Sequence, residues 1–153
     1  MNRLLLAFFG LCCSGTLLAQ SSDHYNMEVI DSLIRTNHHY GPGMVKIDTA
    51  YYRDSEKVSE HYFFNTTTQA LERAVVQVYH TSTNSTIEYY FFLDNSLARV
   101  QTQDYREEEF GEAKIHYFYK DAPIDCEKKG KRDCDSYVQK AKDMISKLRL
   151  ARI

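Results

Sequence analysis

The six histidines are the residues that first suggest chemistry, because neutral imidazole is the commonest metal ligand in proteins. His38 and His39 are adjacent in sequence and cannot share one face of a helix. His61 and His116 fall in two segments that we expect to lie four strands apart, about 19 Å at the usual strand spacing. That separation exceeds one coordination sphere. We therefore expect no metal site and no cofactor.

Acidic residues and possible nucleophiles give no stronger signal of catalysis. The chain has no G-x-S-x-G elbow and no glycine-rich phosphate loop after a strand. The run Glu107-Glu108-Glu109 could be imagined as an acid–base cluster, but adjacent carboxylates at the end of a hairpin are typical of a solvated turn. We expect no catalytic residues and a protein that is not an enzyme.

The first nineteen residues form a predicted secretory signal peptide. A positively charged start precedes the apolar stretch 4–9, and Ala19 supplies the small residue before a cleavage site. Cys12 and Cys13 raise the alternative of a lipoprotein. The lipobox requires a small residue directly before its cysteine, whereas Cys12 follows a leucine and Cys13 follows a cysteine, so we do not favour lipidation.

Export leaves two cysteines, Cys126 and Cys134, which are eight residues apart. In an oxidising compartment such a pair forms a disulfide across a short loop. A metal or redox pair would need a C-x-x-C spacing or further ligands, which the sequence lacks. We predict one disulfide between them.

Composition indicates one free-standing domain over residues 20–153. Mean hydropathy is −0.51 with 26% charged residues, and no second apolar run reaches the length of a membrane span. A formal charge of −2 is too small to indicate nucleic acid as a partner. Twelve Tyr and eight Phe against two Pro favour strands over disorder.

Periodicity predicts an α+β fold with an N-terminal helix, a six-stranded antiparallel β-meander and a C-terminal helix packed on one sheet face. Apolar residues at helical spacing indicate the first helix at 23–38, with Ser21, Ser22 and Asp23 as capping residues. The last helix is capped by Asp133 or Asp135. Short connections place each strand antiparallel beside its predecessor. The predicted strands are 44–51, 58–65, 71–81, 86–93, 97–105 and 112–120.

An internal repeat assigns the two faces of this sheet. Glu60-His61-Tyr62-Phe63-Phe64 and Glu88-Tyr89-Tyr90-Phe91-Phe92 match at four of five places, 28 residues apart, and a third copy at Tyr117-Phe118-Tyr119 lies 27 residues beyond Tyr90. A period near 28 residues is a hairpin used three times. The uniformly aromatic face, expected to be the core under the helices, carries Tyr62, Phe64, Tyr90, Phe92, Tyr117 and Tyr119. The mixed face is the candidate binding surface, and it carries His61, Phe63, Tyr89, Phe91, His116 and Phe118.

The cadence of Tyr-Phe-Phe, Asp-Asn and Leu-x-Arg behind a signal peptide resembles uncharacterised secreted proteins of Bacteroidota built from MORN-like hairpins. The resemblance covers about residues 44–120. It implies export and a curved antiparallel sheet, and it implies no activity.

Two functions remain. The preferred one is a secreted or periplasmic, non-enzymatic binding module that recognises an unknown protein with its sheet face, with a homodimer as one arrangement that could cover that face. The alternative is a carrier that holds a small apolar ligand between sheet and helices. A carrier needs a pocket of several hundred Å³, roughly the size range of small-molecule sites, whereas a protein-binding module shows a flat or concave patch.

Overall fold

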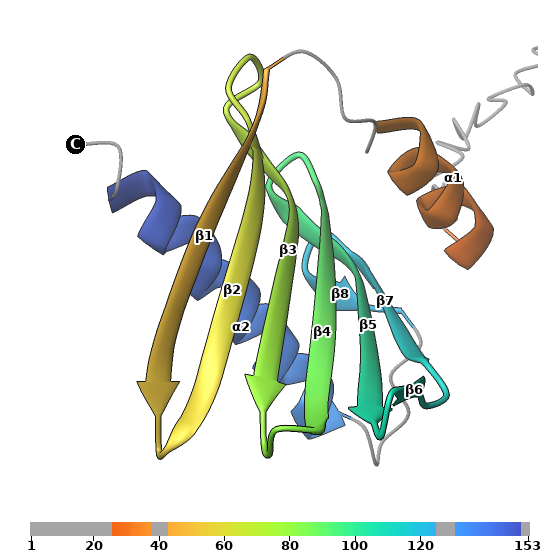
Figure 1. Cartoon of the computed structure of the whole chain (residues 1–153). Helices are drawn as coiled ribbons and strands as arrows, with labels where there is room; N and C mark the ends of the chain where they lie inside the picture. The colour runs from red at the N-terminus through yellow and green to blue at the C-terminus, as the bar shows by residue number, and fades with distance from the viewer. Residues whose placement is uncertain (1–25, 38–42, 125–130, 151–153) are drawn as a thin grey trace, which may run out of the picture.

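A computed structural model of the chain describes residues 26–37, 43–124 and 131–150. Helix α1 (Met27–Asn37) precedes the strands and helix α2 (Lys131–Leu150) follows them (Figure 1). The six long strands are β1 (Met44–Arg53), β2 (Glu56–Asn65), β3 (Ala70–Tyr79), β4 (Asn84–Leu93), β5 (Ser96–Arg106) and β7 (Lys114–Tyr119). Two short strands are β6 (Glu109–Phe110) and β8 (Ala122–Pro123). The α+β class, with a helix at each end of the chain's strands, is confirmed.

The strands form one antiparallel sheet in the order β1-β2-β3-β4-β5-β7-β8, with β6 paired to β5. Tight turns set this meander, and their residues have positive φ although none is glycine. Such left-handed pairs form the type I′ turns whose twist matches that of the flanking strands. The four pairs are Asp54-Ser55, Asp94-Asn95, Glu107-Glu108 and Lys120-Asp121.

Helix α2 covers one side of the sheet, which we call the α2 face. The long strands bury Tyr62, Phe64, Tyr90 and Phe92 against it, as the repeat predicts. From α2 come Cys134, Ala141, Met144 and Leu148. In Figure 1, α2 runs diagonally behind the strands. This layer is the main core of the protein.

Helix α1 packs on the opposite side, which we call the α1 face. Asn26 caps the helix, because its Oδ1 accepts the Val29 N–H at 2.9 Å. The predicted caps at 21–23 lie outside the described residues. Ile30 and Ile34 are 1% and 4% exposed and form a second, smaller core.

The sequence was wrong about the faces of the last long strand. Tyr90 pairs with Val100 and Val100 pairs with His116, so His116 is the counterpart of Tyr90 and lies only 26 residues further on. A shift of one residue turns every side chain of a strand to the other face. Phe118 is therefore buried in the α2 core at 1% exposure, and Tyr117 is buried under α1.

The cause is the connection before β7. Residues 103–113 include the small hairpin β5–β6, with Tyr105 opposite Phe110, in place of the tight turn that the repeat implies. The spacing in sequence therefore no longer equals the spacing in the sheet. Tyr119, also predicted in the core, shares the α1 face with Tyr117 by strand alternation.

Within the described ranges, no helix is long and apolar enough to cross a membrane.

Candidate functional site

The structure separates the six predicted binding residues into two groups. His61, Phe63, Tyr89 and Phe91 lie together on the α1 face, because Phe63 and Phe91 share a row across β2, β3 and β4. His116 lies on the α2 face, with its ring centroid 5.8 Å from that of Tyr137 in α2. The predicted row of Phe63, Phe91 and Phe118 is therefore not formed.

A different row crosses the α1 face. Phe63, Arg73, Phe91, Arg99 and Tyr117 stand opposite one another on five successive long strands. The Arg73 guanidinium lies 4.0 Å from the ring centroid of Phe63, and that of Arg99 lies 4.1 Å from the centroid of Phe91. The row thus repeats a cation–π pair. The Leu-x-Arg motif contained the two arginines, but its sequence did not show what they stack on.

The row ends at α1. Asp31 of α1 accepts a hydrogen bond from Arg99 Nη1 at 2.7 Å and another from the Tyr117 hydroxyl at 2.8 Å. Burial, followed by the hydrogen bond to Asp31, raises the pKa of Tyr117. These contacts fix α1 over the β5–β7 end of the face.

Beyond α1 the same face carries what we call the open strip, made of side chains on β1 to β4. The residues packed under α1 lie on β4, β5 and β7, so α1 does not reach β1 to β3 in the described ranges (Figure 1). Phe63, Val75, Tyr89 and His61 are half-buried there. A solvated face of an antiparallel sheet is normally polar, so half-exposed aromatic rings here are unusual. The open strip consists of Lys46, Asp48, His61, Phe63, Val75 and Tyr89.

Charged groups border the open strip on β1. Asp48 Oδ1 lies 2.6 Å from His61 Nδ1 and 3.0 Å from Lys46 Nζ. The hydrogen bonds with His61 and Lys46 hold the pKa of Asp48 below its usual value. The strip therefore combines apolar rings with a fixed pair of opposite charges.

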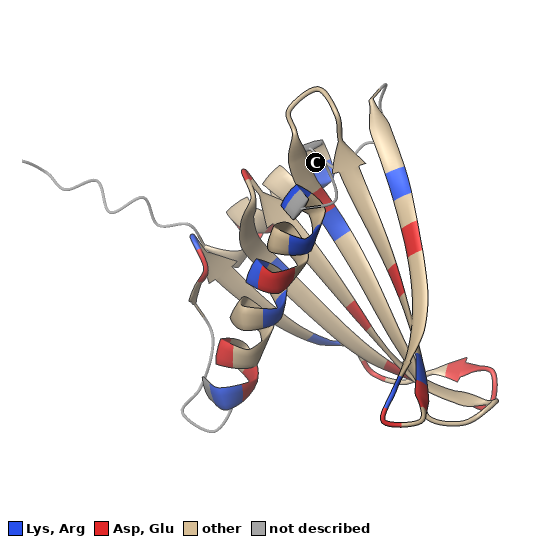
Figure 2. Cartoon of the chain, turned by 90° about the vertical axis from the view of Figure 1, so that its left-hand side faces the viewer, with Lys and Arg blue, Asp and Glu red and all other residues tan. Residues whose placement is uncertain are grey.

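The edge strand β1 is exposed along its length. Figure 2 looks onto this edge from the β1 side. Val45, Ile47, Tyr51 and Tyr52 are 44%, 37%, 38% and 76% exposed. Exposed apolar edge strands are templates for pairing with another strand, and natural proteins usually cover or charge them.

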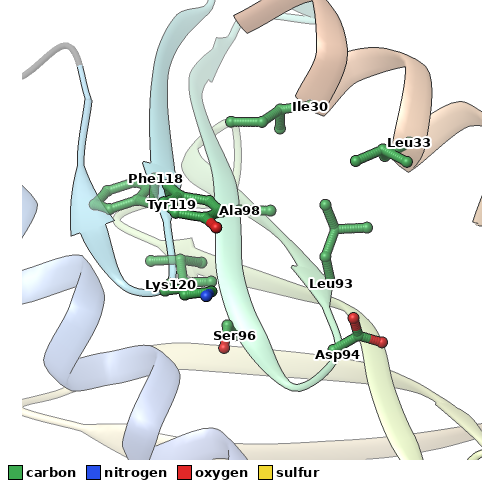
Figure 3. A pocket seen from close by; sticks show the side chains of 10 residues that line it. Ile30, Leu33, Leu93, Asp94, Ser96, Ala98, Phe118, Tyr119 and Lys120 are labelled. Atoms are coloured by element: carbon green, nitrogen blue, oxygen red, sulfur yellow. The ribbon is translucent and has the colours of Figure 1, made fainter. Parts of the chain in front are cut away.

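A groove lies between α1, the β4–β5 turn and β7 (Figure 3). Its cavity volume is about 460 Å³. In Figure 3, Leu33 of α1 and Leu93 of β4 point toward each other on one side, and the Tyr119 hydroxyl and Lys120 amine lie on the other. An apolar wall with a few polar groups is the usual composition of a small-molecule site.

Two buried glutamates lie between the sheet and α2. Glu60 Oε2 accepts a hydrogen bond from the Tyr62 hydroxyl at 2.6 Å and lies 3.6 Å from Lys147 Nζ. Glu88 accepts the Tyr90 hydroxyl at 2.7 Å and two contacts from Lys140 Nζ at 2.9 Å.

Geometry explains why one unit of Glu, Tyr and Lys occurs twice. Glu60 and Glu88 both stand opposite Val76, two strands apart at about 9.6 Å. Lys140 and Lys147 are seven residues apart on α2, a rise of about 10.5 Å. The two spacings match, so each repeat meets one lysine. The signal was present in the sequence as Glu-x-Tyr in both repeats, and we did not recognise it.

The state of Glu60 indicates a structural role for these units. Burial raises the pKa of Glu60, but hydrogen bonds from Tyr62 and Tyr51 and the charge of Lys147 outweigh it, so the pKa lies below its usual value. A general acid at neutral pH needs a raised pKa. Both carboxylates already accept hydrogen bonds from the chain itself, so we assign them to docking α2.

The other residues with possible chemistry are dispersed. Glu107 and Glu108 form an exposed turn at the end of β5. Cys134 is fully buried in the core, whereas Cys126 lies outside the described residues, so the disulfide stays a prediction. Across the described part of the chain, no group of three or more His, Cys, Asp or Glu residues could hold a metal ion.

Comparisons of the chain with protein-family models, with curated proteins and with solved structures found no match.

Proposed function

We propose that the protein is an exported, non-enzymatic binding module that recognises another protein with the open strip of its α1 face. The observation that carries the proposal is the half-exposed row of Phe63, Val75 and Tyr89 beyond the reach of α1. Burying aromatic rings is normally favourable by a few kcal/mol each, on the order of 2, so leaving them at a surface favours recognition.

The rigidity of the surface supports this proposal. The rings stand on the central strands of a continuous sheet, and α2 holds the opposite side through the main core. A surface held in this way loses little conformational freedom when a partner binds. The ion pair of Lys46 and Asp48 at the border supplies the polar rim that such interfaces have.

The test is a double variant, Phe63→Ser with Tyr89→Ser, measured against a partner purified with the protein from its own source. We expect at least about tenfold weaker binding, which is about 1.4 kcal/mol, and a folded protein by circular dichroism. Phe110→Ser is the matched control, because Phe110 is a 60% exposed aromatic ring on β6, outside the strip. Equal affinity of the double variant and the control would contradict the proposal.

Export is part of the same proposal and rests on the apolar leader over residues 4–9. We expect the purified protein to begin at Gln20 when its N-terminus is sequenced. Recovery of a chain that begins at Met1 from the cytoplasm would contradict export, and a lipid on Cys12 or Cys13 would replace it by anchoring.

A carrier of a small apolar ligand is the second candidate, and the cavity of about 460 Å³ beside α1 favours it. The volume lies within the range of about 300–1,000 Å³ that small-molecule sites occupy. Native mass spectrometry of protein from its own source should then show a retained small molecule, and Leu33→Arg should release it. A bare protein mass in both samples would remove this candidate.

A further inference from the structure

The free edge of β1 has a defined hydrogen-bonding pattern. The two-residue turn Asp54-Ser55 makes its neighbours Arg53 and Glu56 a hydrogen-bonded pair, so odd-numbered residues of β1 direct their backbone groups to β2. The Gly43 carbonyl, which accepts the Thr66 N–H at 2.9 Å, follows the same rule. The even-numbered residues from Met44 to Tyr52 therefore direct N–H and C=O groups outward.

The same alternation divides the side chains of β1. Lys46, Asp48 and Ala50 stand on the α1 face, whereas Val45 and Ile47 stand on the α2 face, with 44% and 37% of their surface exposed. An added strand would satisfy the outward backbone groups and cover part of this apolar surface.

We propose that a second copy of this chain supplies that strand, so that β1 pairs antiparallel with β1 of the other copy about a two-fold axis at Ile47. Outward-facing residues must meet outward-facing residues, so the axis can pass only through a residue and not between two residues. This edge contact is separate from the open strip and goes beyond the binding function proposed above.

Charge selects the position of the axis. An axis at Lys46 sets lysine against lysine, and an axis at Asp48 sets aspartate against aspartate, both unfavourable. An axis at Ile47 sets each Lys46 opposite an Asp48 of the other copy. The edge is therefore self-complementary in this register.

The register also matches the apolar surface. Ile47 meets its own copy at the axis and Val45 meets Thr49, so the exposed aliphatic side chains on the α2 face cover one another. Residues 44–50 of each copy overlap and form about eight backbone hydrogen bonds. An isologous contact of this kind closes after two copies and does not extend into a fibre.

The test begins with the oligomeric state. The chain is expressed with its own leader, purified after processing, and measured by sedimentation at concentrations up to about 100 µM. We expect a dimer. Ala50→Pro removes an outward N–H without a ladder bond to β2 and should give a folded monomer, because proline is tolerated on an open edge. Ala50→Thr is the matched control and should stay dimeric.

A mixing experiment tests the register and does not depend on the proline variant folding. Lys46→Asp makes the edge wholly acidic and Asp48→Lys makes it wholly basic, so each alone should dimerise roughly tenfold more weakly or worse. Mixed together, the two should form the heterodimer, seen by native mass spectrometry, since every opposed pair then has opposite charges.

Three results would overturn the proposal: a monomeric wild type over the whole concentration range, a dimer that Ala50→Pro leaves unchanged, or a mixture without heterodimer. Loss of dimerisation in Ala50→Pro with intact partner binding would separate this edge from the open strip. A wild type that is monomeric yet binds its partner would refute the edge contact alone.

Discussion

Replacement of Phe118 by alanine tests the two arrangements of β7 against each other. Phe118 is 1% exposed in the core under α2, whereas Phe63 is half-buried on the open strip. A phenylalanine buries about 200 Å² of surface, and large-to-small changes at fully buried aromatic positions cost about 3–5 kcal/mol. At Phe63 about half of that surface is buried, and its stacking with Arg73 adds about 0.5–1 kcal/mol, so we expect a loss of about 2 kcal/mol.

The assay is urea unfolding followed by circular dichroism, with the free energy of unfolding compared at constant slope. Small domains are stable by about 5–15 kcal/mol, so Phe118→Ala can populate the unfolded state even without urea. Phe118→Leu provides a milder step and should cost about 1–1.5 kcal/mol. Equal losses for Phe118→Ala and Phe63→Ala would return Phe118 to the row that the sequence repeat implies, and would refute our placement of β7.

Three further changes have expected outcomes. Replacing both Cys126 and Cys134 by serine should lower the free energy of unfolding by about 2–3 kcal/mol, and alkylation of the native protein should detect no free thiol in that pair; two alkylated thiols would refute the disulfide. Because the pKa of Glu60 is lowered in the folded state, its contribution to stability is present above its unfolded pKa and is lost as pH falls through the folded value. Glu60→Gln should thus lose less stability than the wild type between neutral and acid pH, and equal acid sensitivity would contradict this. Glu107 and Glu108 hold φ of 49° and 70°, so replacing the pair with Asn-Gly should raise stability by about 1 kcal/mol, whereas an unchanged unfolding midpoint would show that the turn is unstrained.

The sequence predicted the fold class and the order of the elements because periodicity is a local property. Alternation along β2 and β4 correctly placed Tyr62, Phe64, Tyr90 and Phe92 under α2. The first helix was also found, although its apolar stripe did not indicate which face of the sheet it covers. That depends on Asp31 reaching Arg99, a contact between residues 68 positions apart.

The candidate site was predicted only in part, since it depended on an equal spacing of repeats. The spacing held from β2 to β4, so His61, Phe63, Tyr89 and Phe91 share a face as expected. It failed at β7 because the β5–β6 hairpin changes the register. A sequence repeat measures residues along the chain, whereas a face depends on parity in the ladder, and one residue is enough to invert it.

The central claim, that the open strip binds a protein partner, is tested most directly by photo-crosslinking. A photo-reactive residue is placed at Tyr89 and, as the control, at Gln139, which is exposed on α2 at the other side of the sheet. Irradiation in the compartment where the protein resides should give an adduct with one distinct partner from position 89 alone, and Phe63→Ser in the same chain should abolish it. Equal adducts from both positions, or adducts from position 139 alone, would contradict the claim.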